Sequence, residues 1–167
     1  MVSTNNMNEK ISFGDDGMNF YLPATSIRVW LHTNAQINDL IFESIISNIK
    51  YYIDKSGDEI TQRLLELDEE WDTERVLETS ASGLVITGAI LALTSKNKLW
   101  ALLSAVTGGF LLQHALQGWC PPLPFIRRLG VRTQTEIMAE KTLLEVLKED
   151  PQKLDEERIR EIVRNII

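Results

Sequence analysis

Cysteine and histidine are scarce in this chain of 167 residues, which has one cysteine and two histidines. A single cysteine excludes an internal disulfide and a thiolate zinc site. The sequence also lacks a glycine-rich phosphate loop, a serine-nucleophile motif and a metal-binding signature. From these absences we expect no catalytic residue, no cofactor and no metal, and we predict that the protein is not an enzyme.

Basic residues are outnumbered, because 17 Lys and Arg stand against 24 Asp and Glu and the formal net charge is −7. A nucleic-acid-binding surface needs clustered positive charge, so we expect no nucleic-acid partner. The first residues, "MVSTNNMNEKISFGDDG", are polar and have no apolar core. That composition argues against a signal peptide.

Charged residues are missing altogether from two stretches, one between Glu78 and Lys96 and one between Lys98 and Arg127. The first contains "TSASGLVITGAILALTS", about 17 residues that would rise about 25 Å as a helix, near the lower limit for a membrane span. The second, from Leu99, would rise about 33 Å by the cysteine, enough to cross a hydrocarbon core of about 30 Å. The sequence therefore predicts two transmembrane helices.

The two stretches are joined by the short turn "KNK", which makes them a helical hairpin over residues 79–120. Pro121 and Pro122 are expected to end the second helix, because neither can donate the backbone hydrogen bond that continuation requires. The lipid bilayer is thus the first partner that the sequence predicts.

Aromatic and basic residues flank the predicted hairpin in the way that is typical of membrane interfaces. Along one continuous helix Trp100 and Trp119 would lie about 28 Å apart, one at each headgroup layer. Arg127 and Arg128 follow the second span, and we expect them at the same interface. Basic residues at the outer ends of the hairpin (Arg75, Arg127, Arg128, Arg132) outnumber those at its turn (Lys96, Lys98), which predicts that both termini are cytoplasmic.

Small residues recur at a spacing of four inside both spans, a pattern that lets helix backbones approach closely in lipid. The predicted helix-packing residues are Gly88, Ala92, Ala101, Ser104, Ala105, Gly108 and Gly109. The spacing leaves open whether the contact lies within one hairpin or between copies. It favours a homo-oligomer or a subunit of a larger membrane complex.

Amphipathic helices are predicted on both sides of the hairpin, because apolar residues recur there every three or four positions. Before the hairpin, one stripe runs from Ile37 to Tyr52, and a second helix begins after Ser56-Gly57 with Asp58 as its predicted cap. The stripe of the second helix is Ile60, Leu64, Leu67 and Trp71, beside acids expected to be solvated (Glu66, Asp68, Glu69, Glu70).

After the hairpin, Thr133 and Glu136 have the spacing of a capping box, and Pro151 is expected to end the helix that they begin. Asp155 is the predicted cap of a last helix, whose apolar face contains Ile159 and Val163.

The predicted fold class is therefore all-α, a membrane helical hairpin of two transmembrane helices flanked by amphipathic cytosolic helices. Residues 1–35 are expected to be a mobile or extended N-terminal arm, in which "SIRVWLH" is a short strand or extended segment. Residues 36–78 hold the N-terminal amphipathic helices, 79–120 the hairpin, and 121–167 the C-terminal amphipathic helices.

The blocks "ELDEEWDTERVLETSASGLVITGAILAL" and "GFLLQHALQGWCPPLPFIRRLGVRTQTEI" resemble the YgaP-like inner-membrane domain family, a domain of unknown function. Cys120-Pro121 matches the family's Cys-Pro pair at the exit of the second span, and the resemblance covers about residues 65–135. It implies a location in the bacterial inner membrane and association as a dimer. In the best-known architecture the spans anchor a rhodanese sulfurtransferase domain. This chain has no second cysteine and no alternating strand–helix pattern, so it resembles a stand-alone subgroup and the activity is not carried over.

Three functional hypotheses follow. The first is a non-enzymatic hairpin that anchors and organises cytosolic helices. The second is a thiol redox or sulfur-relay accessory protein that uses Cys120, since nearby arginines can lower a thiol pKa. His114 lies six residues away and off the same helix face, so it is expected to have a structural or interfacial role, for example against Gln113 or Gln117 of a neighbouring copy. The third is a soluble helical oligomer with the apolar hairpin buried between copies.

Overall fold

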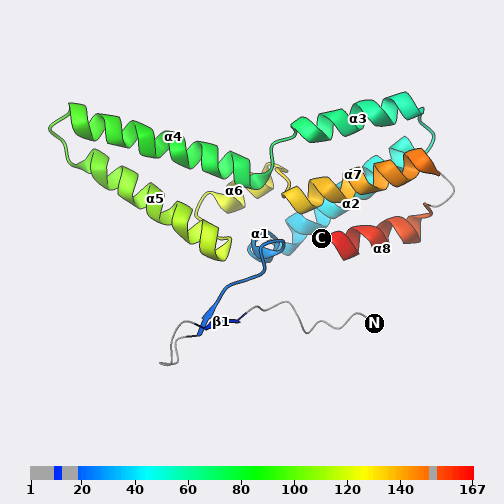
Figure 1. The fold of residues 1–167 in the computed structure, drawn as a ribbon, viewed down its shortest axis with the longest axis horizontal. Coiled ribbons are helices and arrows are strands. Elements are labelled where there is room, and N and C mark those ends of the chain that lie inside the picture. The colour runs from blue at the N-terminus through cyan, green and yellow to red at the C-terminus, as the bar shows by residue number, and fades with distance from the viewer. Residues whose placement is uncertain (1–9, 13–18, 151–153) are drawn as a thin grey trace. The chain divides into compact units, whose positions relative to one another are not determined.

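The computed structural model describes residues 10–12, 19–150 and 154–167 (Figure 1). The prediction of a helical fold is confirmed, and the small strands β1 (Lys10–Ser12) and β2 (Asn19–Tyr21) pair antiparallel. The helices of the described residues are α1 (Arg28–Leu31), α2 (Ala35–Tyr52), α3 (Gly57–Glu69), α4 (Thr73–Thr94), α5 (Leu99–Gln117), α6 (Leu123–Arg128), α7 (Gln134–Glu149) and α8 (Glu156–Ile166).

The chain divides into two compact units. Of the described residues, the hairpin unit consists of those up to His32 together with Leu77–Leu123, and the bundle unit consists of Thr33–Val76 together with those from Pro124 to Ile167. Each unit is assembled from two separate parts of the sequence.

The core of the bundle unit lies among α2, α3, α7 and α8, with α7 packed against the other three (Figure 1). The predicted apolar stripes point into this core, and Ile45, Ile49, Leu144, Ile159 and Val163 are fully buried. Burying a side chain of this size contributes about 1.5–3 kcal/mol. Two residues of the predicted stripes do not enter the core. Leu40 on α2 is 71% exposed, and Trp71 lies beyond α3, which ends at Glu69, and is also exposed.

The caps of the bundle helices agree with the sequence at two of three positions. Thr133 and Glu136 form a capping box at the start of α7, and the Asp155 carboxylate accepts a hydrogen bond at the start of α8. The predicted cap Asp58 is wrong, because Ser56 caps α3 and the side chain of Glu59 returns to the Ser56 backbone N–H. Asp58 instead lies in the first turn, where its negative charge favours the helix N-terminus.

In the hairpin unit, α4 and α5 run side by side in opposite directions and are joined by a short turn (Figure 1). The start of α4 at Thr73 is earlier than predicted, so the helix rises about 33 Å. The predicted end of α5 at the prolines is wrong. The helix closes at Gly118, whose φ of 75° is left-handed and whose N–H donates to the His114 carbonyl at 2.7 Å. Trp119 therefore lies beyond the helix, and its predicted spacing from Trp100 along one continuous helix does not hold.

The predicted N-terminal arm is folded over part of its length. Residues 1–9 and 13–18 lie outside the described residues, but α1 is a helical turn rather than the predicted strand or extended segment. Its Arg28 Nη1 donates to the Ala115 carbonyl of α5 at 2.7 Å. A Cβ atom at Gly118 would lie 2.6 Å from Arg28, so only glycine allows this approach.

Candidate functional site: the apolar hairpin and its flanking charges

Among the described residues, α4 and α5 contain the apolar segments long enough to cross a membrane, and these segments are not part of a protein core. Only 11% of the apolar window in each helix is buried. Single exposed apolar residues are common on protein surfaces, but a large continuous apolar surface is typical of a site that contacts a membrane or another protein. The large apolar side chains exposed on the two helices are Leu84, Ile86, Ile90, Leu93, Leu99, Leu102, Val106, Phe110, Leu112 and Leu116.

One helix–helix contact lies within the hairpin, and it involves two of the predicted packing residues. The Ser104 hydroxyl of α5 donates to the Val85 carbonyl of α4 at 3.0 Å. A Cβ atom at Gly88 would lie 2.5 Å from the Ser104 Oγ and 3.0 Å from the Trp100 carbonyl oxygen. Glycine at this position therefore lets the two backbones approach, as small residues do between membrane helices.

The other predicted packing residues divide into two groups. Ala92 and Gly108 are half-buried, and a Cβ atom at Gly108 would meet no atom within 4 Å. Ala101, Ala105 and Gly109 are exposed. These three residues thus lie on the exposed surface of α5.

The four residues predicted at the membrane interface differ in their exposure to solvent. Arg128 and Trp119 are exposed and Trp100 is half-buried. The prediction for Arg127 is wrong, because its side chain is completely buried in the bundle unit.

All five N–H groups of the Arg127 guanidinium are used inside the bundle unit. Two donate to the carboxylate of Glu136 at 2.6 and 2.7 Å, in a bidentate ion pair. The others donate to the Asn38 side chain at 3.1 Å, the Thr33 hydroxyl at 3.1 Å and the Val131 carbonyl at 2.9 Å. An arginine has five donors in a fixed planar arrangement, so this site satisfies it fully.

A second buried carboxylate, Glu140, lies one turn further along α7. It accepts hydrogen bonds from Arg63 at 3.0 Å, from Asn48 at 3.3 Å and from Arg132. Arg132 also pairs with Glu70, the residue that follows α3. Three of the four acids expected to be solvated are therefore in ion pairs, because Glu66 pairs with Arg63 and Asp68 with Lys141. Burial alone would lower the pKa of Arg132, but the hydrogen bonds that it donates to Glu70 and the negative charge of Glu140 outweigh burial and raise that pKa.

Sequence reasoning missed these two buried clusters, although a signal was present. Glu136 and Glu140 are spaced by four on α7 and interleave with Ile137 and Leu144 of the apolar face. Acids at core positions need cationic partners, because an unpaired buried charge is strongly unfavourable. That signal predicts buried arginines, but it does not say which ones.

Cys120 and His114, the residues weighed as a thiol–imidazole pair, are both buried in the hairpin unit. His114 is only 2% exposed within a single chain, so its side chain is not presented to a glutamine of a neighbouring copy as expected. The thiol of Cys120 is 3% exposed, and the basic side chain expected to activate it, Arg127, is directed to Glu136 instead.

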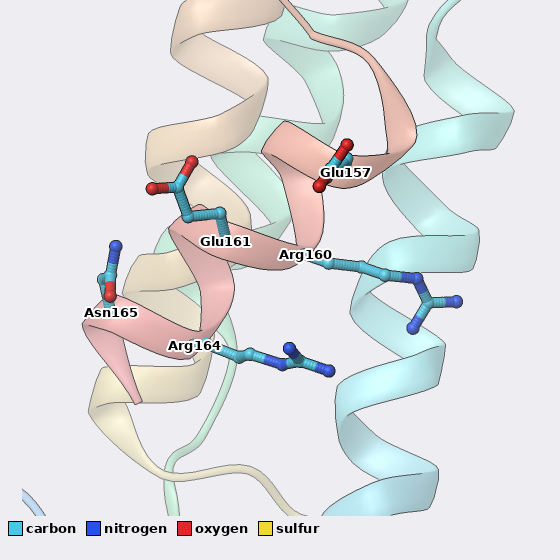
Figure 2. A pocket seen from close by; sticks show the side chains of 5 residues that line it. All are labelled: Glu157, Arg160, Glu161, Arg164 and Asn165. Atoms are coloured by element: carbon cyan, nitrogen blue, oxygen red, sulfur yellow. The ribbon is translucent and has the colours of Figure 1, made fainter. Parts of the chain in front are cut away.

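Figure 2 shows the side chains that line a shallow pocket on the surface of α8. All of its lining residues come from this one helix: Glu157, Arg160, Glu161, Arg164 and Asn165. Arg160 extends toward α2, where its guanidinium pairs with the Glu43 carboxylate at 2.6 Å. Within residues 10–12, 19–150 and 154–167, no group of His, Cys, Asp or Glu side chains is arranged to hold a metal ion.

Comparison with known proteins found no matching family, no matching curated protein and no matching solved structure. The resemblance to the YgaP-like inner-membrane domain stays a prediction.

Proposed function

We propose that this protein is a non-enzymatic integral membrane scaffold, in which the α4–α5 hairpin is inserted in the bacterial inner membrane and anchors the helical bundle unit. The observation that carries the proposal is the outward-facing apolar surface of both helices, with no charged residue between Glu78 and Lys96 or between Lys98 and Arg127. A hairpin of this kind satisfies its backbone hydrogen bonds within each helix, as a lipid environment requires.

The alternative of a soluble oligomer would have to cover the same apolar surface with other copies of the chain. Apolar residues are exposed on several sides of each helix, from Leu84 to Leu93 on α4 and from Leu99 to Leu116 on α5. A soluble helix normally presents one apolar stripe to its core and a polar face to water. The bilayer covers every side of the hairpin at once, and this favours membrane insertion.

The alternative of a sulfur or redox carrier requires a thiol that solvent and partners can reach. Cys120 is buried, and this favours the scaffold over the carrier.

The orientation and assembly belong to the same proposal. The excess of arginines at the outer ends of the hairpin supports an orientation with both termini in the cytoplasm. The exposed row of Ala101, Ala105 and Gly109 is suited to close contact with a second hairpin, so we propose a homo-oligomer, most simply a dimer. Membership of a larger membrane complex would use the same surface.

Membrane insertion is tested by alkaline carbonate extraction of the membranes that contain the protein. We expect the protein to stay in the pellet and to need detergent for release, and recovery in the soluble fraction would overturn the proposal. Val106→Arg, in the middle of α5, should oppose insertion by about 2.5–3.5 kcal/mol. The matched change Asn97→Arg in the turn should insert normally, so equal behaviour of the two variants would also contradict insertion.

The oligomer is tested by light scattering of the detergent-solubilised protein. Ala105→Leu enlarges a residue of the exposed small-residue row and should reduce the molar mass of the assembly. Val106→Leu, one position round the helix, should reduce it less. A monomeric parent protein would remove the homo-oligomer from the proposal, and an equal loss in both variants would assign the contact to another face.

A further inference from the structure

Helix α6, which follows the second apolar helix after a five-residue link, exposes an apolar edge that the bundle core does not use. Phe125 is 71% exposed and Leu129 is 79% exposed. The Leu129 N–H donates to the Phe125 carbonyl at 3.2 Å, so the two side chains lie one helical turn apart on the same side. The opposite side of this turn, with Ile126 and Arg127, is buried.

This exposed edge is held close to the first residue of α4 by backbone hydrogen bonds. The chain turns at Gly130, whose φ is 82°, and the Arg132 carbonyl then accepts from the Thr73 N–H at 2.8 Å. The Thr73 hydroxyl also donates to the Val131 carbonyl at 3.3 Å. Leu129 therefore lies only two residues before Val131, whose carbonyl accepts a hydrogen bond from Thr73, the first residue of α4.

A second exposed aromatic residue lies at this same point. Trp71 precedes α4 by two residues and is 48% exposed. The guanidinium of Arg75 stacks over its ring, with 4.8 Å between the guanidinium carbon and the ring centroid. On α6, Arg128 is exposed beside Phe125 and Leu129.

Chain length limits how far these residues can be from the ends of the apolar helices. Phe125 is eight residues after Gln117, which allows at most about 28 Å of fully extended chain. Aromatic and large apolar side chains beside arginines are typical of the headgroup region, where the rings and alkyl groups enter the acyl boundary and the guanidinium groups meet phosphates.

We infer that Trp71, Arg75, Phe125, Arg128 and Leu129 form an interfacial collar, a surface that docks the bundle unit on the headgroup layer of the bilayer. The inference rests on the proposed membrane insertion. In place of the buried Arg127, it assigns the headgroup contacts to residues that precede the hairpin in the sequence and to residues that follow it. The occupant of this surface is lipid, contacted by Phe125 and Leu129 at the depth of the acyl boundary.

The test uses nitroxide spin labels on the full chain, reconstituted in vesicles of phosphatidylethanolamine and phosphatidylglycerol. Single cysteines are introduced in a Cys120→Ser background as Leu129→Cys, Val106→Cys and Tyr51→Cys. Tyr51 is a matched control, because it is 62% exposed but lies about 20 Å along α2 from Asn38, the partner of Arg127. Collision of each label with oxygen and with a water-soluble nickel chelate distinguishes lipid, water and protein surroundings.

We expect the label at position 129 to collide more with oxygen than with the chelate, as the mid-span label at position 106 does, while the label at 51 shows the reverse order. A water-exposed label at 129 together with a lipid-exposed label at 106 would overturn the collar and leave membrane insertion standing. Water exposure at both positions would overturn the proposed function, and the collar with it. A label at 129 shielded from both reagents would show that protein, for example a second copy, covers this edge, and would also overturn the collar.

Discussion

Replacing Arg127 by methionine tests whether the buried ion pair, rather than a lipid contact, accounts for this arginine. The substitution keeps a long apolar side chain and removes the guanidinium. It leaves the Glu136 carboxylate, which is 1% exposed, without its bidentate partner. It also removes a donor from Asn38 and from Thr33.

The expected cost is large, because removing one partner of a buried ion pair leaves the other charge uncompensated in a low-dielectric site. Such changes destabilise proteins by about 3–5 kcal/mol, against total stabilities of about 5–15 kcal/mol. If Arg127 instead lay at a headgroup layer, the same change would remove a solvated charge. Substitutions of that kind cost about 0.5 kcal/mol or less.

The assay is urea unfolding of the full chain in mild detergent, followed by the helical circular dichroism signal. The neighbouring change Arg128→Met is the matched control, because this arginine is exposed. Adding Glu136→Gln to Arg127→Met should recover a large part of the lost stability, since glutamine is neutral and still serves the capping box with Thr133. Equal stability of the two single variants, or no recovery in the double variant, would refute the reasoning.

Three further outcomes are expected. Gly88→Leu should separate α4 from α5 and lower the melting temperature of the hairpin in detergent. The control Gly83→Leu on the same helix should have little effect, because an added Cβ there meets no atom within 4 Å, and equal effects would exclude a specific contact at Gly88. The thiol of Cys120 should react slowly with a maleimide in the native protein and quickly in urea, and fast native labelling would instead support the sulfur-relay hypothesis. Hydrogen bonds from Arg160 lower the pKa of Glu43 below its ordinary 4.5, so this pair stabilises the packing of α8 above pH 4.5 and is lost as the pH falls through the lowered pKa. The protection of α8 amides relative to their intrinsic exchange rate should fall over that range, and an unchanged protection profile in Arg160→Gln would contradict this cause.

The helical class, most helix positions and the two candidate spans could be predicted from the sequence. These features depend on local patterns. Apolar residues every three or four positions predict which face of a helix is buried, as at Ile45 and Leu144, and a capping box is visible from Thr133 and Glu136 alone. The absence of charge between Lys98 and Arg127 likewise predicts an apolar helix without any knowledge of its neighbours.

Local features with competing signals were predicted less well. The alternation in residues 26–32 suggested a strand, but a single helical turn forms there, with Arg28 bonded to the end of α5. Two prolines suggested the end of α5, but Gly118 ends it earlier, because glycine adopts the left-handed conformation that closes the helix. At Ser56 and Asp58, two neighbouring residues could each cap a helix, and the reciprocal hydrogen bonds with Glu59 decide for serine.

The partners of the charged residues could not be predicted from the sequence, because they depend on how the helices pack. Arg127 and Arg128 are adjacent in a sequence that reads as a membrane-flanking pair, yet one is buried against Glu136 and the other is exposed. The difference arises because successive residues of a helix point in different directions, and α6 turns one of them toward the acids of α7. Sequence periodicity reports which faces are apolar, whereas the pairing of two charges depends on the packing of helices that are distant in the chain.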